Sequence, residues 1–226
     1  MLAKTSAMEP DSSSYPALKF LNEFAEIEKS RNRLPHWRQD RATYFVTYRL
    51  GDSIPDVLMK MWREQRTRWC QQHQLPWSTE TASDYHRLFS STIDRHLDNG
   101  HGCCLLREPA NAEVVAGAFH HYDQSHYLLH AWVIMPNHVH VLVSPGEADA
   151  LPRIVAGWKR FTGMRINART GMSGTFWQKD YFDRLIRDWD HFMNVARYIA
   201  RNPAKAKLRD GEFMSFEAPW VKRLLS

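Results

Sequence analysis

Two histidines separated by one residue, His138 and His140, have the type and spacing of a pair of metal ligands. They lie in residues 127–144, where β-branched and aromatic residues predict β-strands. Residues i and i+2 of a strand share a face, so the two imidazoles would project side by side while Val139 points the other way. Neutral imidazoles bind divalent cations well. An isolated His-x-His is also typical of packed or surface histidines, so other residues must decide between these two interpretations.

A second pair, Tyr198 and Asn202, is spaced four residues apart in a segment with helical periodicity. Residues 190–202 place apolar side chains on one helix face, which we assign to the core: Phe192, Val195, Ala196 and Ile199. Tyr198 and Asn202 are neighbours at the border of that face. A tyrosine in this place could present its hydroxyl to an anion, or be half-buried with its hydroxyl in water. Because the residue before a proline disfavours helical geometry, Pro203 predicts that Asn202 ends the helix or lies at a kink.

Strands and helices alternate along the rest of the chain. The strand-forming segments are residues 42–50, 127–135, 138–144 and 181–186. The helical segments are residues 18–30, 55–73, 83–97, 113–123, 151–167 and 190–202. Pro136 and Asn137 predict a tight hairpin turn between the second and third strands. This order predicts an α+β fold, a small sandwich with helices on one face of a largely antiparallel sheet. The sequence contains no Gly-rich phosphate loop.

Composition narrows the class of protein. The chain has 226 residues and a formal net charge of +5, which permits a nucleic-acid partner without requiring one. No apolar run approaches the about 20 residues of a membrane span. Three cysteines without a CxxC spacing predict a reduced chain in the cytoplasm, without structural zinc. We expect a flexible N-terminal extension over residues 1–30, one functional domain over residues 31–208 and a C-terminal tail over residues 209–226.

Several segments, taken in order, resemble one family. Residues 130–142 contain Met-Pro-Asn-His-Val-His, which resembles the His-hydrophobic-His signature of the single-tyrosine HUH transposases, and especially the IS200-like branch called REP-associated tyrosine transposases. Residues 34–37 with 42–47 resemble the opening strand region of that branch. Residues 176–184 resemble its next block, and residues 198–208 resemble its tyrosine helix. Order and spacing agree throughout the matched segments.

The resemblance implies a ferredoxin-like or RRM-like sandwich, with the histidines on a central strand of an antiparallel sheet and the tyrosine on a helix across from it. It also implies a reaction. Members of the family cut single-stranded DNA beside an imperfect hairpin. The tyrosine attacks the scissile phosphate, forms a 5′-phosphotyrosine and frees a 3′-hydroxyl. A 3′-hydroxyl can reverse the step, so that strands are rejoined without ATP.

Carried onto this chain residue by residue, the resemblance makes His138 and His140 metal ligands and Tyr198 the nucleophile. Asn202 stands where relatives use a glutamine as third ligand, and asparagine is shorter by one methylene. The implied cofactor is a divalent metal, Mg²⁺ or Mn²⁺, which would polarise a nonbridging phosphate oxygen and orient the phosphate for attack. Tyrosine needs such help because its unperturbed pKa is about 10. Tyr181, in a predicted strand, is the competing nucleophile.

The predicted DNA-binding residues are basic or aromatic. Charged side chains would contact phosphates and aromatic ones would stack on unpaired bases. The alternative is ordinary solvated basic residues and a core tryptophan. The residues are Arg33, Trp37 and Arg38 before the first strand; Trp158, Lys159, Arg160 and Arg165 on the helix over residues 151–167; and Arg184, Arg187, Arg201 and Lys205 around the tyrosine. The expected partner is single-stranded DNA with imperfect hairpins, bound by a monomer or a homodimer, with no membrane and no nucleotide cofactor.

Two other functions fit parts of the sequence. A non-catalytic RRM-like module would bind nucleic acid without cutting it, and would need neither the histidine pair nor the Tyr198–Asn202 pair. A zinc hydrolase would use His138 and His140, but the sequence offers no convincing third ligand such as a correctly spaced His, Cys or Glu. Cleavage of a hairpin oligonucleotide with a covalent protein–DNA adduct separates the transposase-like endonuclease from both.

Overall fold

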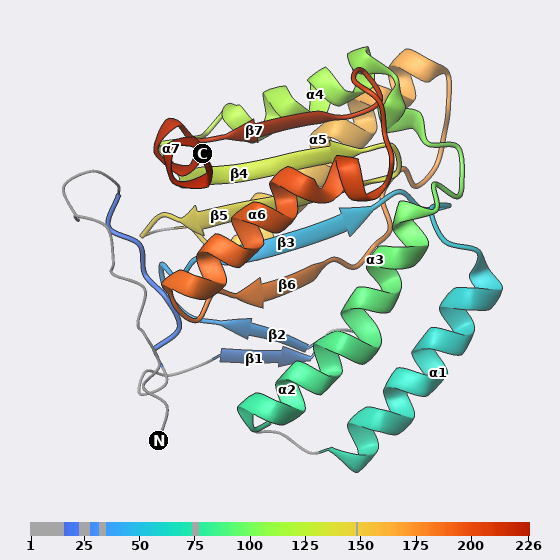
Figure 1. Cartoon of the computed structure of the whole chain (residues 1–226). Helices are drawn as coiled ribbons and strands as arrows, with labels where there is room; N and C mark the ends of the chain where they lie inside the picture. Colours follow the sequence, from blue (N-terminus) through green and yellow to red (C-terminus); the bar gives the residue numbers. More distant parts are fainter. Residues whose placement is uncertain (1–15, 23–27, 32–34, 74–76, 148) are drawn as a thin grey trace.

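An antiparallel sheet of five strands forms the centre of the structure, a computed structural model that describes residues 16–22, 28–31, 35–73, 77–147 and 149–226. The strands stand in the order β6–β3–β5–β4–β7 (Figure 1). Their bounds are β3, Tyr44–Arg49; β4, Tyr127–Met135; β5, His138–Pro145; β6, Phe182–Leu185; and β7, Met214–Glu217. Much of the N-terminal extension expected over residues 1–30 lies outside the described residues.

Four of these strands have the connections of a ferredoxin-like sandwich. β3 pairs antiparallel with both β6 and β5, and β5 pairs antiparallel with β4, which is the strand order of a βαββαβ unit folded on itself. The helices in the two crossovers are α4, Pro109–His120, and α5, Leu151–Thr170. The predicted α+β fold with an antiparallel sheet is therefore confirmed. The core strands begin and end within two residues of their predicted ranges.

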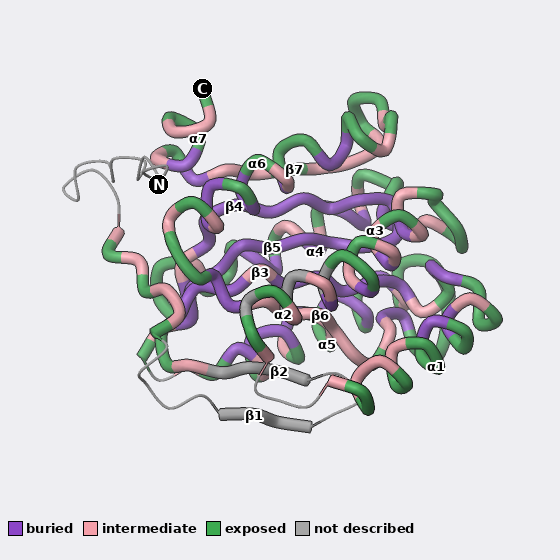
Figure 2. The backbone as a smooth tube through the Cα atoms, turned by 60° about the horizontal axis from the view of Figure 1, so that its bottom comes forward, coloured by how far each residue is buried: buried purple, intermediate pink, exposed green. Residues whose placement is uncertain are grey.

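Helices cover both faces of the sheet, whereas the sequence predicts helices on one face. α4 and α5 pack on one side, and α6, Trp189–Lys205, packs with α7, Pro219–Leu225, on the other. Figure 2 shows β4 and β5 buried along almost their whole length between these layers. The one-face prediction is wrong because these strands carry apolar side chains on both sides. In the described ranges no helix is both long and apolar enough to cross a membrane.

The β4–β5 hairpin brings the histidines to a defined face. Met135 pairs with His138, which leaves the two-residue turn that the sequence predicts. The apolar cluster on the α4–α5 side contains the valines of β5: Val139, Val141 and Val143. Leu142 belongs instead to the cluster on the α6 side. Since side chains alternate along a strand, His138 and His140 face α6 together with Leu142.

Between β3 and α4 the chain forms a separate helical layer. It comprises α1, Asp56–Gln72; α2, Thr79–Tyr85; a π-helical turn, His86–Ser90; and α3, Ser91–Asp98. These helices share their own apolar cluster, whose buried members are Ile54, Met59, Trp62, Tyr85, Phe89, Ile93 and Leu97. The helix predicted over residues 83–97 thus begins earlier and is interrupted by the π-helical turn. Figure 1 shows the end of α3 beside the end of α6, where Asp98 and Lys205 form an ion pair of 2.8 Å.

Two predictions near the ends of the chain are wrong. The helix predicted over residues 18–30 is not found where that segment is described: residues 16–22 have no regular structure, and β1, Glu28–Arg31, pairs with β2, Pro35–Arg38. The tail expected over residues 209–226 instead adds β7 to the sheet edge beside β4. A strand of four residues is too short to show a period in the sequence, whereas its pairing with β4 defines it in the fold.

Candidate active site

The histidine pair lies on β5 on the face that α6 covers. Both imidazoles are fully buried, and their Nε2 atoms are 3.2 Å apart. β5 holds the rings side by side because residues i and i+2 of a strand share a face, as the spacing of His138 and His140 predicts. Two ring nitrogens that converge in this way offer two ligands to one cation.

Hydrogen bonds to the other ring nitrogens orient both imidazoles. Asn137 donates from its Nδ2 to the carbonyl of His101 over 3.0 Å, so its Oδ1, which is 2.8 Å from Nδ1 of His138, acts as an acceptor. Nδ1 of His138 therefore carries the proton, and Nε2 keeps its lone pair. Nδ1 of His140 is 2.7 Å from the hydroxyl of Thr47 on β3. Partners of this kind fix the orientation of metal-binding histidines.

Burial keeps both histidines neutral. It lowers the pKa of His138 to about 3, and the charge of Lys205 lowers it further. Burial also lowers the pKa of His140 well below its ordinary value, with smaller effects from His138 and Lys205. A proton therefore does not compete for these rings near neutral pH, and their lone pairs are available to a cation.

Tyr198 projects from α6 toward the histidine pair. Its hydroxyl is 3.5 Å from Nε2 of His140. The ring of Phe45 packs against both side chains, with its centroid 5.3 Å from that of His140 and 5.8 Å from that of Tyr198. α6 begins with Asp188 as its N-cap, whose carboxylate accepts from the backbone N–H of His191 over 2.7 Å. The capped helix and Phe45 together hold the phenol beside the histidines.

Asn202 lies one helical turn after Tyr198 and is fully buried. α6 continues through Pro203 to Lys205, so Asn202 is not the last helical residue. Among the described residues, neither its amide oxygen nor its amide nitrogen forms a hydrogen bond of normal geometry, although the amide lies near the Tyr198 hydroxyl and lowers the pKa of that phenol. Buried amides without partners are rare because they cost free energy. The residues present therefore fit a divalent cation held by two imidazoles and one amide oxygen.

The described residues do not add a His, Cys, Asp or Glu side chain as a third metal ligand. In the part of the chain that the structure describes, no three His, Cys, Asp or Glu side chains gather into a cluster that could hold a metal ion. A catalytic zinc site uses three such ligands, so the structure gives no support to the zinc-hydrolase alternative. An amide oxygen is a typical ligand of harder cations such as Mg²⁺ and Mn²⁺.

Helix α3 adds two carboxylates that the sequence prediction missed. Asp94 lies near the Tyr198 hydroxyl, and the two groups shift each other's pKa. Asp98, one turn later, pairs with Lys205, whose ammonium lies 5.6 Å from the centroid of the Tyr198 ring. The i, i+4 spacing of Asp94 and Asp98 shows in the sequence that they share a helix face. Only the fold shows that this face of α3 lies beside Tyr198 and Lys205.

Burial changes the pKa of both the phenol and the carboxyl beside it. It raises the pKa of Asp94 to about 6, an effect that the contact with Tyr198 partly offsets. It also raises the pKa of Tyr198 well above its ordinary value, and the charges of Asp94 and Asp98 raise it further. The phenol is therefore protonated at neutral pH. It needs a cation and a proton acceptor to become a nucleophile.

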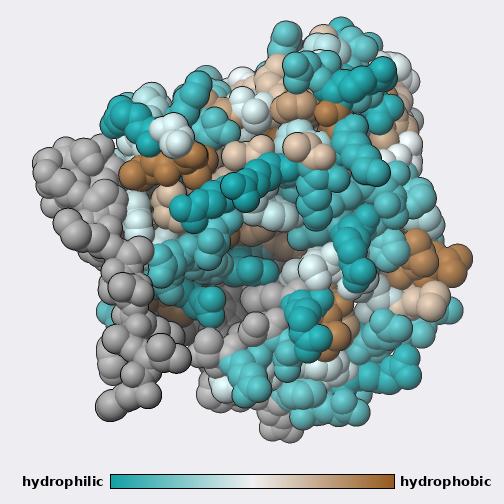
Figure 3. All heavy atoms as spheres, viewed as in Figure 1, coloured by the Kyte–Doolittle hydropathy of each residue, from teal (hydrophilic) through white to brown (hydrophobic). Residues whose placement is uncertain are grey.

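An anion can approach this site from the side of α3 and the end of α6. A pocket of about 350 Å³ opens there, and His138 and Asn137 contribute to its wall. Its basic lining residues are Arg107, Lys207 and Arg209. Figure 3 shows that the face carrying α6 and α3 is hollowed and largely hydrophilic. Asp98 and Glu212 also line the pocket, and Glu212 pairs with Arg107 and Arg209, so the entrance is polar and of mixed charge.

Comparison with known families identifies the segment that carries this site. Residues 109–202 match the family model described as IS200-like transposase. This segment, which is less than half of the chain, is similar to the IS200-like transposases. It contains every residue predicted to do chemistry, namely His138, His140, Tyr198 and Asn202. The resemblance noted in the sequence is thereby confirmed at the level of the family.

Two solved structures are similar to this chain at low sequence identity. One is a REP-associated tyrosine transposase bound to a REP hairpin, with a TM-score of 0.38 and 16% identity, covering 76% of this chain and 74% of that chain. The other is a Deinococcus radiodurans protein assigned as a transposase, with a TM-score of 0.31 and 12% identity, covering 82% of this chain and 98% of that chain. No curated protein matches the chain.

Part of the predicted DNA surface lies on the far side of the sheet. α5 packs on the face opposite the histidines. Trp158 is 4% exposed, and its Nε1 donates to the hydroxyl of Tyr127 over 2.9 Å. The prediction that Trp158 stacks on a base is therefore wrong, and the core interpretation holds. The basic residues predicted on the same helix stay predictions, separated from the site by the sheet: Lys159, Arg160 and Arg165.

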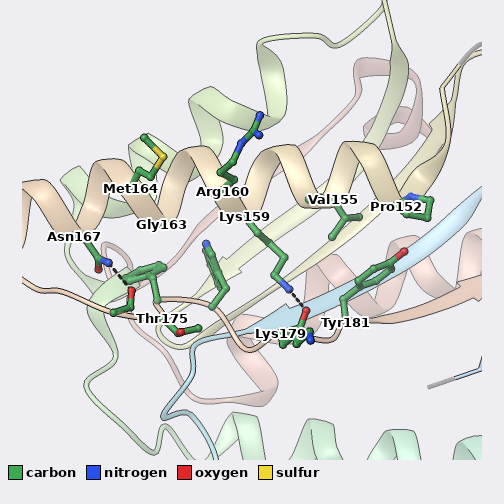
Figure 4. A pocket seen from close by; sticks show the side chains of 14 residues that line it. Pro152, Val155, Lys159, Arg160, Gly163, Met164, Asn167, Thr175, Lys179 and Tyr181 are labelled. Carbon is green, nitrogen blue, oxygen red and sulfur yellow. Dashed lines mark hydrogen bonds between the residues drawn. The ribbon is translucent and has the colours of Figure 1, made fainter. Parts of the chain in front are cut away.

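Tyr181, the competing nucleophile, also lies on the α5 side. It lines a pocket of about 450 Å³ with residues of α5 and packs against the core cluster of that face. Figure 4 shows its ring close to Lys159, whose ammonium donates to the carbonyl of Lys179 over 2.7 Å. Tyr181 and Tyr198 thus stand on opposite faces of the sheet, and Tyr198 is the one beside the histidines.

The basic residues predicted around the tyrosine fall into two kinds. Arg184 on β6 is half-buried; burial lowers the pKa of its guanidinium, and the charge of Asp94 raises it. Arg184 pairs with Phe45, which contacts Tyr198, so it lies on the same sheet face as Tyr198, and Lys205 lies beside the Tyr198 ring. Arg187 precedes α6 and Arg201 lies on α6, and both are exposed.

The structure describes only part of the predicted DNA-binding segment before the first strand. Trp37 and Arg38 belong to β2, which lies near β6. Arg33 lies outside the described residues. Their predicted contacts with DNA stay predictions.

Proposed function

We propose that the chain is a single-strand DNA endonuclease and strand transferase that cuts and rejoins DNA beside REP-like hairpins through a 5′-phosphotyrosine. The family match supports its activity as a transposase. One arrangement carries the finer proposal: a tyrosine hydroxyl and two neutral imidazole nitrogens lie together, with an unpartnered buried amide one helical turn from the tyrosine. A module that merely binds nucleic acid has no need of this arrangement.

His138, His140 and Asn202 are the residues that would hold the divalent cation, Mg²⁺ or Mn²⁺. When bound, the cation polarises a nonbridging oxygen of the scissile phosphate and offsets its negative charge. The chain prepares the ligands for this task, because Asn137 and Thr47 orient the two rings and burial keeps them unprotonated.

Tyr198 supplies the attacking oxygen. As the bond between its Oη and phosphorus forms, the bond between phosphorus and the 3′-oxygen breaks, and the phenolic proton passes to the carboxylate of Asp94. The 3′-oxygen takes a proton from water and leaves as a 3′-hydroxyl. Attack by a 3′-hydroxyl on the phosphotyrosine reverses these changes, so the energy of the phosphodiester is kept in the covalent bond. Lys205, beside the ring, favours the developing negative charge on the phenol.

The proposed partner is single-stranded DNA with an imperfect hairpin, bound by a monomer or a homodimer. Arg184 and Lys205 are placed to contact phosphates near the nucleophile, and Arg187 and Arg201 extend the basic surface along α6. The proposed localisation is the cytoplasm, which the three cysteines without a CxxC spacing predict from the sequence.

The decisive experiment is covalent capture on hairpin oligonucleotides taken from the flanks of the protein's own gene. Wild-type protein with Mn²⁺ should form a species that carries labelled DNA through a denaturing gel. Tyr198→Phe and His140→Ala should abolish this species, because one removes the attacking oxygen and the other a metal ligand. Tyr181→Phe is the matched control and should still form it.

A protein–DNA adduct formed by Tyr198→Phe would reject the assignment of the nucleophile. Tight binding of every hairpin by the wild type, with no adduct and no cleavage, would reject the endonuclease and favour the non-catalytic RRM-like module.

A further inference from the structure

A second pocket, of about 200 Å³, lies between β3 and the helical layer formed by α1, α2 and α3. The proposed reaction does not use it. β3 and the segment before β6 form one side, and α1 forms the other. Three arginines line it, Arg49, Arg63 and Arg66, against one acidic residue, Asp180. Pockets that bury a whole small molecule measure about 300–1,000 Å³, so this one suits a single unit of a longer ligand.

Arg49 is the residue whose environment calls for an anion. It is 4% exposed, and its hydrogen bonds go to neutral acceptors, the carbonyl of Leu50 over 3.3 Å and the hydroxyl of Ser53 over 3.0 Å. Within the described chain, no carboxylate forms an ion pair with it. Burial and the charge of Arg63 lower the pKa of Arg49 to about 10, an effect that the charges of Asp56, Asp180 and Asp52 partly offset, so it is still a cation at neutral pH. A buried cation without a directly paired carboxylate costs free energy that a bound anion would offset.

The rest of the lining suits a nucleotide unit. Arg63 is exposed at the rim, and Arg66 is half-buried with its Nε donating to the hydroxyl of Tyr85 over 2.6 Å. The rings of Trp62 and Phe182 meet edge to face, with centroids 5.8 Å apart. Guanidinium groups match the geometry of phosphate oxygens, and aromatic rings offer apolar surface to a base.

The pocket adjoins the histidine site through two residues of β3. Thr47 lines the pocket, and its hydroxyl contacts Nδ1 of His140. Arg49 stands directly opposite His138 in the β3–β5 pairing. Residues opposite each other in an antiparallel pair have Cα atoms about 4.5–5.5 Å apart and project on the same face. A DNA strand whose scissile phosphate lies at the histidines therefore has a neighbouring unit within reach of Arg49.

We propose that this pocket binds one phosphodiester unit of single-stranded DNA next to the scissile phosphate. Arg49 and Arg63 hold the phosphate, and the base lies against Trp62 and Phe182. The position of that unit relative to the cut rests on the proposed function, whereas the binding of a single-stranded unit does not depend on cleavage. The inserted helices then help to set where the strand is cut, because they hold it on one side of the nucleophile.

The test is equilibrium binding of oligothymidylate by the full chain in EDTA, so that no cleavage is needed. Arg63→Ala is compared with Arg68→Ala, an arginine of the same helix that is exposed and lies outside the pocket. Arg63→Ala should weaken binding about threefold more than the control and lower the salt slope by about 0.7, the value for one phosphate contact on a single strand. Arg49→Met should weaken binding too, yet unfold at the same temperature as the wild type or higher, since it removes a buried unpaired charge.

Equal effects of Arg63→Ala and Arg68→Ala, or unchanged affinity in a folded Arg49→Met protein, would overturn the proposal. So would displacement of the oligonucleotide by inorganic phosphate at the same concentration, because the site would then belong to a free anion. Covalent capture on the hairpins is scored separately. If adducts form but the pocket variants bind oligothymidylate normally, the proposed function is kept and the pocket proposal is rejected. If the pocket variants bind more weakly but no adducts form, the pocket proposal is kept and the proposed function is rejected.

The position of the bound unit is read with hairpin oligonucleotides that carry one neutral methylphosphonate. Neutralising the phosphate that Arg63 contacts should make the wild type and Arg63→Ala bind equally well. We expect this at a single position beside the cleavage site. If the two affinities become equal at no methylphosphonate position, or at a position within the hairpin stem, the bound unit does not lie beside the cleavage site.

Discussion

The unpartnered amide of Asn202 predicts that its replacement by leucine stabilises the metal-free protein. Asn202 is fully buried, and neither polar atom of its amide forms a hydrogen bond of normal geometry in the described chain, although the amide lies near the Tyr198 hydroxyl. A buried polar group left unpaired costs about 1–3 kcal/mol, and leucine of similar shape removes that cost. For a domain of this size, 1 kcal/mol shifts the melting temperature by about 2–4 °C, so Asn202→Leu should melt about 2–12 °C higher in EDTA.

Mn²⁺ should reverse the order of the melting temperatures of the wild type and Asn202→Leu. Wild-type protein at a hundredfold excess of metal over Kd should gain about 2.7 kcal/mol from binding. Asn202→Leu should gain less, because a third ligand is missing. Thermal unfolding of both proteins, in EDTA and in a Mn²⁺ series, measures the two effects in one experiment.

Asn111 provides the matched control. It is 1% exposed, but its amide donates to the carbonyl of Leu105 over 2.8 Å and accepts from Arg169 over 3.1 Å. Asn111→Leu should therefore lower the melting temperature in EDTA. If Asn202→Leu is also destabilised in EDTA, or gains as much from Mn²⁺ as the wild type, Asn202 is a structural residue and the reasoning fails.

Three further predictions concern the groups around Tyr198 and His140. Adduct formation by the wild type should speed up as pH rises through about 6, where Asp94 ionises, and Asp94→Asn should lose this limb and react about 10²–10⁴-fold more slowly. Because burial raises the pKa of folded Asp94, its contribution to stability should be present below about pH 4 and lost as pH rises through about 6; the melting temperature of Asp94→Asn should lack that change. Lys205→Met should slow adduct formation and reduce the free energy of unfolding by up to about 1 kcal/mol through loss of the pair with Asp98, whereas an unaltered rate would deny it a role beside the phenol. Thr47→Val should weaken Mn²⁺ binding about 10–100-fold in calorimetric titration, and an unchanged Kd would show that the hydroxyl does not support His140.

Local patterns in the sequence predict the centre of the fold well. The β4–β5 hairpin follows from two apolar runs around a Pro-Asn turn, and its bounds fix which face His138 and His140 share. Tyr198 and Asn202 follow in the same way from helical periodicity. Pro203 misleads at one point, because a proline in the last turn does not end α6. These features depend on residues close together in the chain, where spacing and geometry are directly related.

Contacts between distant segments are what the sequence does not reveal. The approach of Asp94 to Tyr198 depends on how the inserted helices pack against α6, and no local period encodes that packing. The burial of Trp158 follows from the sheet face that α5 covers, which a helical stripe alone does not specify. β7 is recognisable through its pairing with β4 and not through its own four residues.

The helical layer between β3 and α4 divides the proposed site into two parts. The proposed metal ligands and the proposed nucleophile lie between residues 138 and 202, within the segment that matches the family model. Asp94 and the lining residues Trp62 and Arg63 come from the inserted layer, which precedes that segment. Under the proposed function the layer therefore supplies both the proton acceptor and the neighbouring pocket. We expect exchange of the layer to change the rate and pH dependence of the reaction together with the choice of cleavage position.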